Sequence, residues 1–141
     1  MKNHLLSFGH GYSAQALGRV LHPLGWQVSG TTRNPDKAKQ MRAEGVEPLL
    51  WENADAIHAA LRSATHVLAS AGPDAQGDPV LRIFGEEIAK RAGQFKWVGY
   101  LSTTGVYGDH QGQWVDESTP LTPSTKRGRA RIAAEAQWQD I

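Results

Sequence analysis

The sequence predicts an α/β fold built on a doubly wound parallel sheet of about five strands. Short apolar runs alternate with segments in which apolar residues recur every three or four positions, and glycine or proline stands at most of the junctions. An apolar run without polar alternation is typical of a strand buried on both faces of a parallel sheet. The length of 141 residues suits one domain, and we expect that domain to cover residues 1–141.

The strands are expected at the short apolar runs, which cover residues 4–8, 26–31, 46–51, 65–71 and 96–102. The helices are expected at the periodic segments between them, which cover residues 12–24, 34–44, 55–63 and 79–92. Three of these helices stop before Gly25, Gly45 and Gly93, because glycine commonly follows a helix end. Asn34 followed by Pro35 is typical of an N-cap and a first helical turn.

A different pattern follows the fifth expected strand. Thr103–Thr125 is rich in glycine, threonine, proline and aspartate, which predicts a long ordered loop. Loops of this length are uncommon in compact domains unless they serve a function. A last helix is expected from about Arg127 to residue 139, and the chain ends where this alternation would place a further strand.

Composition and charge argue against several classes of protein. The formal net charge of +1 gives no reason to expect nucleic acid, a membrane or another polyanion as a partner. The absence of cysteine excludes disulfides, thiolate metal sites and cysteine nucleophiles. The first residues lack the apolar segment of a signal peptide, and no run reaches the roughly 20 apolar residues of a membrane span. We therefore expect a cytoplasmic protein. The six histidines show no metal-ligand spacing, so we expect no metal site.

A glycine-rich turn joins the first expected strand to the first helix. Its sequence, Gly9-His10-Gly11-Tyr12-Ser13-Ala14, matches the dinucleotide-binding pattern with alanine at the third small position. Gly9 permits the tight turn, Gly11 leaves room for a diphosphate, and Ala14 lets the helix lie close to the strand. Amides at the helix N-terminus bind phosphates well. We predict that these six residues hold a dinucleotide, with His10 filling a variable position of the turn.

The end of the second expected strand carries Thr31-Thr32-Arg33, and this favours the phosphorylated cofactor. Sites that prefer NAD usually place a carboxylate about 20 residues beyond the glycines, where it accepts from a ribose hydroxyl. Here Arg33 is suited to pair with a 2′-phosphate and Thr32 to add a hydroxyl donor. Asp36, in the first turn of the next helix, is explained by the helix dipole. We predict NADP(H) in preference to NAD(H), with a plain surface arginine as the alternative.

Several segments together resemble the short-chain dehydrogenase/reductase superfamily, in particular its extended and atypical members of the NAD(P)-dependent epimerase/dehydratase type. The segments are residues 9–14, 31–33, 69–73 and 100–108, and the last, which ends in Val106-Tyr107-Gly108, is the most specific. The resemblance spans nearly all of the chain and corresponds to the N-terminal, Rossmann-like half of such proteins. It implies that their C-terminal substrate lobe is absent here, so the substrate, a nucleotide sugar or another small molecule, is not assigned.

The resemblance also implies site residues. Ala71, Gly72 and Pro73 would flank the riboses of the dinucleotide, and Gly72 would allow a close approach of the backbone. Thr103 takes the place of the family's hydroxyl residue, which bonds the reacting oxygen of the substrate. A hydroxyl at the carboxyl end of a central strand faces the ligand crevice, although threonine also simply suits a strand end.

The family's acid/base pair is missing. The family uses a tyrosine and, four residues later, a lysine; here those positions hold Arg127 and Arg131. Arginine does not donate a proton near neutral pH, so the proton relay does not carry over. Three functions stay open: an NADP(H)-dependent oxidoreductase or epimerase-like enzyme, a non-catalytic dinucleotide-binding or sensor module, and a flavodoxin-like or other α/β binding domain. The basic residues 126–131 are most simply a solvated turn, with a phosphate or a nucleotide-sugar diphosphate as the alternative partner.

Self-association is the last expectation. A sheet that ends after about five parallel strands has an open edge and an uncovered apolar face, and such surfaces are usually paired or buried. In the resembling family, dimers form through the helices that correspond to residues 79–92 and 127–139. We therefore expect a homo-oligomer with apolar contacts from Ile83, Phe84, Ile132 and Trp138.

Overall fold

The computed structural model describes residues 2–141 and contains a parallel sheet of five strands in the order β3-β2-β1-β4-β5. The strands are β1 (His4–Phe8), β2 (Gln27–Thr32), β3 (Glu47–Leu50), β4 (His66–Ala69) and β5 (Trp97–Tyr100). The α-helices are α1 (Tyr12–Leu21), α2 (Pro35–Ala43), α3 (Ala54–Ser63), α4 (Pro79–Lys90) and α5 (Lys126–Gln139). Three short 3₁₀ turns are η1 (His22–Leu24), η2 (Ala92–Gln94) and η3 (Thr104–Tyr107).

The predicted fold class is confirmed. The strand order is the one of the Rossmann fold, whereas flavodoxin-like proteins follow the order 2-1-3-4-5, so the flavodoxin-like alternative is wrong. Each expected strand and helix is present, with shifted ends. The helix expected over residues 12–24 stops at Leu21 and continues as η1, which contains Pro23; the helix expected over 79–92 stops at Lys90.

Side-chain caps define where the later helices begin. Asn34 accepts a hydrogen bond from the Asp36 amide, which confirms the N-cap expected for α2. Thr125 accepts from the Gly128 amide, so α5 begins at Lys126, one residue before the expected start. The loop expected over 103–125 is present but opens with η3.

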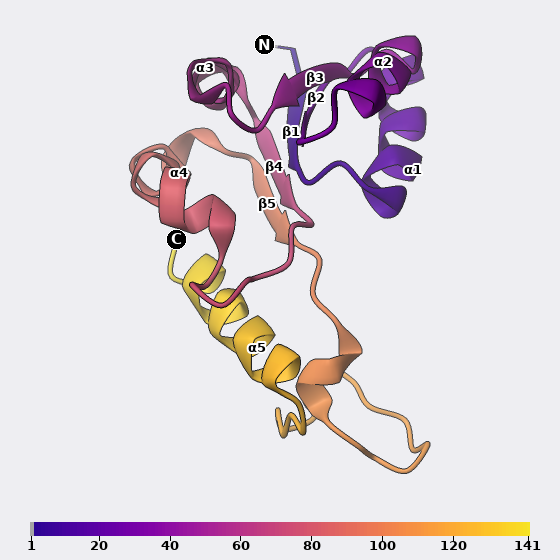
Figure 1. Cartoon of the computed structure of the whole chain (residues 1–141), viewed down its shortest axis with the longest axis vertical. Helices are drawn as coiled ribbons and strands as arrows, with labels where there is room; N and C mark the ends of the chain where they lie inside the picture. Colours follow the sequence, from indigo (N-terminus) through magenta and orange to yellow (C-terminus); the bar gives the residue numbers. More distant parts are fainter. Residues whose placement is uncertain (1) are drawn as a thin grey trace.

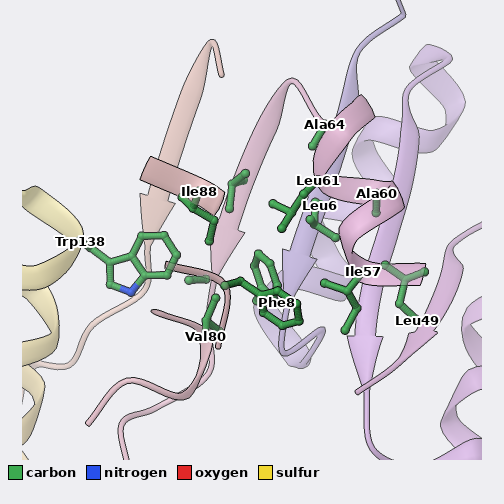
Figure 2. Close-up of a cluster of buried hydrophobic side chains, with 13 residues drawn as sticks. Leu6, Phe8, Leu49, Ile57, Ala60, Leu61, Ala64, Val80, Ile88 and Trp138 are labelled. Atoms are coloured by element: carbon green, nitrogen blue, oxygen red, sulfur yellow. The ribbon is translucent and has the colours of Figure 1, made fainter. Parts of the chain in front are cut away.

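The sheet is covered on both faces, as Figure 1 shows: α1 and α2 lie on one face, and α3 and α4 lie on the other. One buried cluster combines β1, α3 and α4 with the end of α5, and Figure 2 shows Phe8 at its centre and Trp138 at its margin. A second buried cluster joins α1 and α2 to the opposite face through Ala14, Val28 and Met41. Parallel pairing brings the carboxyl ends of all five strands to one edge of the sheet.

The strand β5 forms an open edge, as the sequence predicts. Its first two residues, Trp97 and Val98, are 47% and 37% exposed. The expected helix contacts between copies are wrong for two residues, because Phe84 and Trp138 are buried in the chain's own core. Ile83 is half exposed and stays available, whereas Ile132 is partly buried. None of the helices within residues 2–141 has the length and apolarity that a membrane crossing requires.

Candidate functional site

A cleft of about 390 Å³ opens at the carboxyl ends of β1, β2, β3 and β4. The sheet brings together there the glycine turn, the end of β2 and the segment after β4, which are three of the four segments singled out in the sequence. The lining residues are Gly9, His10, Gly11, Thr31, Thr32, Arg33, Lys37, Trp51, Ala71, Gly72 and Pro79. The cleft therefore contains most of the residues predicted to hold a dinucleotide, together with four that were not predicted: Thr31, Lys37, Trp51 and Pro79.

The turn after β1 is held in shape by two hydroxyl groups. The Gly9 amide donates to Thr31 Oγ1 at 2.8 Å, and Ser70 Oγ donates to the Gly9 carbonyl at 2.6 Å. Gly9 has φ +75°, and a Cβ there would lie 3.1 Å from the Ala71 amide nitrogen. A side chain is therefore disfavoured at Gly9 by both backbone conformation and space. Sequence reasoning missed Thr31 and Ser70 because a hydroxyl residue near a strand end has many ordinary explanations.

Gly11 is the N-cap of α1 and stands at the open side of the turn. Its backbone is extended, at φ −93° and ψ −157°, and no side chain caps the helix. A Cβ at Gly11 would meet nothing closer than the Gly9 carbonyl oxygen at 3.8 Å. Tyr12 and Ser13 expose their side chains, whereas Ala14 is buried against the sheet as expected. The first turn of α1 therefore lies open at the cleft, the arrangement in which helix N-termini bind phosphate groups.

His10 differs from its neighbours because its ring points away from solvent. The side chain is 1% exposed and packs against Gly30, where an added Cβ would lie 2.8 Å from the His10 Cβ and Cγ. Neither ring nitrogen has a hydrogen-bond partner among the described residues. Burial lowers the pKa of the His10 imidazole, and the nearby Lys37 charge lowers it further. His10 thus contributes backbone to the cleft and a neutral packing group beneath it, and its ring is not placed to contact a diphosphate.

The end of β2 presents two cations to the cleft. Arg33 is exposed and its guanidinium carbon lies 5.8 Å from the centre of the Trp51 ring, while Lys37 lies one turn further on in α2. The expected donor role of Thr32 is not supported: its hydroxyl accepts from the Asn34 amide at 3.1 Å and lies 3.5 Å from the Asn34 carbonyl. Thr32 therefore shapes the turn that carries Arg33.

A second cavity, of about 920 Å³, adjoins the first beyond Gly72. Its lining combines the loop after β4 with the start of α5, and the lining residues are Pro73, Asp74, Ala75, Thr103, Gly105, Thr125, Lys126, Arg127, Gly128, Ala130 and Arg131. Thr103 faces this cavity and Ser102 a different one, as strand alternation predicts. The Thr103 hydroxyl also accepts from the Gly105 amide at 3.3 Å. The predicted site residues thus divide between two neighbouring cavities.

No family model matches the chain. The protein YeeZ of Escherichia coli is 30% identical in an alignment of 131 residues, and the alignment covers 86% of this chain and 47% of YeeZ. A functionally unknown conserved protein from Silicibacter pomeroyi DSS is 58% identical with a TM-score of 0.91, over 98% of this chain and 48% of that one. The chain therefore spans about half the length of these relatives.

A solved structure with a named activity is dTDP-glucose 4,6-dehydratase from Bacillus anthracis in complex with NAD. Its TM-score is 0.72 at 16% identity, over 98% of this chain and 51% of that one. Other structures with this fold are a reductase, a hexosamine dehydratase and a 4-epimerase, each about half covered. The chain has the Rossmann-like fold of these structures. The resemblance found in the sequence is confirmed at that level, and the matched part is a Rossmann half.

Arg131 stands at the position where the sequence resemblance would place the family's lysine. The Arg131 Nη1 donates to the Leu101 carbonyl at 3.0 Å, and its Nη2 would stand 2.8 Å from a Cβ at Gly72. The room expected beside Gly72 for a ribose is therefore partly filled by a guanidinium. Among residues 2–141, no tyrosine lines either cavity. The Tyr100 hydroxyl is buried, and this burial raises its pKa.

Proposed function

We propose that this chain is the nucleotide-binding half of an epimerase/dehydratase-like or reductase-like protein and that it holds NADP(H) in preference to NAD(H). The observation that carries the proposal is the charge of the first cleft. Arg33 and Lys37 line it at the end of β2, and no carboxylate lines it among residues 2–141. A cofactor with a 2′-phosphate gains a charge-assisted pair at such a site, whereas a free ribose hydroxyl finds no carboxylate to accept from it.

The proposed binding mode follows the order of the lining residues. The diphosphate lies on the turn at Gly9 and Gly11, where the open first turn of α1 supplies amides and a positive dipole end. The adenosine end extends across the sheet toward Trp51 and the two cations of β2 and α2. The nicotinamide end extends past Ala71 toward the second cavity, which Thr103 lines.

Calorimetric titration of the 141-residue chain with NADPH, NADH and flavin mononucleotide tests the proposal. Arg33→Ala removes the proposed phosphate contact and is expected to weaken NADPH binding by about tenfold or more, and NADH binding by about twofold or less. Lys37→Ala acts in the same direction. Arg42→Ala is the matched control, because Arg42 is an exposed arginine of α2 outside the cleft. Equal loss of NADPH and NADH in Arg33→Ala overturns the cofactor preference.

A second candidate function is a non-catalytic dinucleotide-binding or sensor module. The replacement of the family's tyrosine and lysine by Arg127 and Arg131 favours it, because neither arginine exchanges a proton near neutral pH. A hydride-transfer assay separates the two: NADPH binding without turnover of nucleotide sugars or small carbonyl compounds supports the sensor.

Self-association through the exposed edge at Trp97 and Val98 is part of the proposal, and sedimentation measures it. The cytoplasmic location stays a prediction from the sequence.

A further inference from the structure

We propose that the second cavity is an oxyanion site, in which Arg127 and Arg131 bind a phosphate or carboxylate group of the protein's small-molecule ligand. The oxyanion site lies outside the dinucleotide cleft, so anion binding there does not depend on the proposed function. Only the statement that the ligand is a substrate or effector of the protein rests on that function. Nothing in the dinucleotide chemistry requires a pair of guanidinium groups in a second cavity.

The cavity carries an excess of positive charge. Lys126, Arg127 and Arg131 line it, against the single carboxylate of Asp74. That carboxylate is already engaged, because both of its oxygens accept from Arg82 at 3.0 Å, and this bond lowers the pKa of Asp74. The three cations of α5 therefore have no anion in the cavity to neutralise them.

Arg131 is held in place before any ligand arrives. Its Nη1 donates to the Leu101 carbonyl, its guanidinium carbon lies 5.8 Å from the centre of the Tyr100 ring, and its Nη2 abuts Gly72. These contacts tie the guanidinium to the ends of the paired strands β4 and β5, and the segments that follow both strands line this cavity. A guanidinium has five N–H donors, and the hydrogen bond to Leu101 uses one of them. A group so fixed loses little conformational freedom when it binds an anion.

Arg127 stands one helical turn before Arg131 and lines the same cavity. Residues four apart lie on one face of a helix, and two like charges there repel each other unless an anion lies between them. Neither arginine forms an ion pair within the described part of the chain. Phosphate and carboxylate share the planar two-oxygen edge that a guanidinium binds in a bidentate way. The two arginines therefore form a receptor for one oxyanion.

The position of this receptor suits a ligand that lies next to the dinucleotide. Gly72 lines the first cleft and is in contact with Arg131, which lines the second, so the two cavities meet at this pair. Thr103 faces the same space. A ligand anchored through its oxyanion at Arg127 and Arg131 would place its remaining atoms near the Thr103 hydroxyl and the proposed nicotinamide end.

The test titrates the 141-residue chain with inorganic phosphate and, separately, with malonate, and measures binding by heat and by chemical shift changes. Arg127→Ala and Arg131→Lys are each expected to weaken the tighter anion by about fivefold or more. Arg129→Ala is the matched control, because Arg129 is an exposed arginine of α5 that does not line the cavity. Arg131→Lys keeps the charge but loses the bidentate geometry. The tighter of the two anions identifies the source of the oxyanion as phosphate or carboxylate.

Three outcomes overturn the inference: neither anion binds, Arg127→Ala and Arg131→Lys bind as tightly as wild type, or Arg129→Ala loses as much affinity as they do. Phosphate held at the glycine turn would give the second outcome, because that turn is in the other cleft. NADPH titration of Arg127→Ala separates this inference from the proposed function, since it is expected to stay within about twofold of wild type. Anion binding that depends on Arg127 in a chain that does not bind NADPH would refute the proposed function and leave the oxyanion site standing.

Discussion

Replacing Gly11 by alanine should abolish most dinucleotide affinity while the fold stays intact. The backbone of Gly11 is extended, with φ −93°, and the space around an added Cβ is empty to 3.8 Å. Alanine at a compatible position stabilises by about 0.4–1 kcal/mol through the unfolded chain. The preference for glycine over alanine at an N-cap offsets that gain by a similar amount. We therefore expect the free energy of unfolding to change by no more than about 1 kcal/mol in either direction.

The expected loss of affinity comes from the space that the new methyl group takes. Gly11 lines the cleft, so its Cβ would project where the proposed diphosphate approaches the amides of the first turn of α1. A hydrogen bond to a charged group contributes about 1.5–3 kcal/mol. Loss of one such bond weakens binding about tenfold to a hundredfold.

Gly9→Ala is the contrasting variant. Gly9 has φ +75°, and its Cβ would lie 3.1 Å from the Ala71 amide nitrogen, so alanine there combines backbone strain with a tight contact. Strain of this kind amounts to about 1–2 kcal/mol, and we expect Gly9→Ala to be destabilised by at least that much. Urea unfolding measures both stabilities, and calorimetry with NADPH measures binding. Wild-type affinity in Gly11→Ala would refute the placement of the diphosphate on this turn, and equal destabilisation of the two variants would refute the backbone argument.

Two further predictions concern the core and the pH dependence of folding. Trp138→Phe removes the 2.9 Å hydrogen bond from Trp138 Nε1 to Asp78 Oδ2 and leaves a buried carboxylate oxygen without that partner, so the free energy of unfolding in urea should fall by about 1–3 kcal/mol. Trp114→Phe is the control, because Trp114 is fully exposed, and it should leave the free energy of unfolding unchanged. Equal effects of the two variants would contradict the packing of α5 on α4. Because burial lowers the pKa of His10 in the folded chain, the unfolded chain binds the proton more readily, and the stability that is present above about pH 6.5 should fall as the pH drops below it. Burial also lowers the pKa of His4 and of His66, so His10→Leu should reduce this slope without removing it, and an unchanged slope would show that His10 does not contribute.

The fold was predictable because its signals are local. The turn at Gly9 and Gly11, the N-cap Asn34 and the apolar run of β1 each depend on a few neighbouring residues, and the structure confirms all of them. The ends of elements were predicted less well, because hydrogen bonds from later residues decide them. The Thr125 cap, for example, moves the start of α5 by one residue.

The contents of the two cavities were only partly predictable, because side-chain direction depends on residues distant in the chain. Gly30 provides the space into which the His10 side chain turns, so a residue of the phosphate turn became part of the core. Trp138 was expected to face another copy of the chain, yet its bond to Asp78 and its burial place it inside.

The resemblance to the short-chain dehydrogenase/reductase superfamily implies that Arg127 and Arg131 stand where that family has a tyrosine and a lysine. The sequence by itself determined the α/β alternation and the glycine turn. These follow from residue identity and spacing along the chain. Only the tertiary structure decided that Lys37 and Trp51 join Arg33 at one cleft and that Arg131 bridges Leu101 and Gly72. Parallel pairing gathers strand ends that are far apart in the sequence at one edge, and the side chains that meet there are set by that pairing.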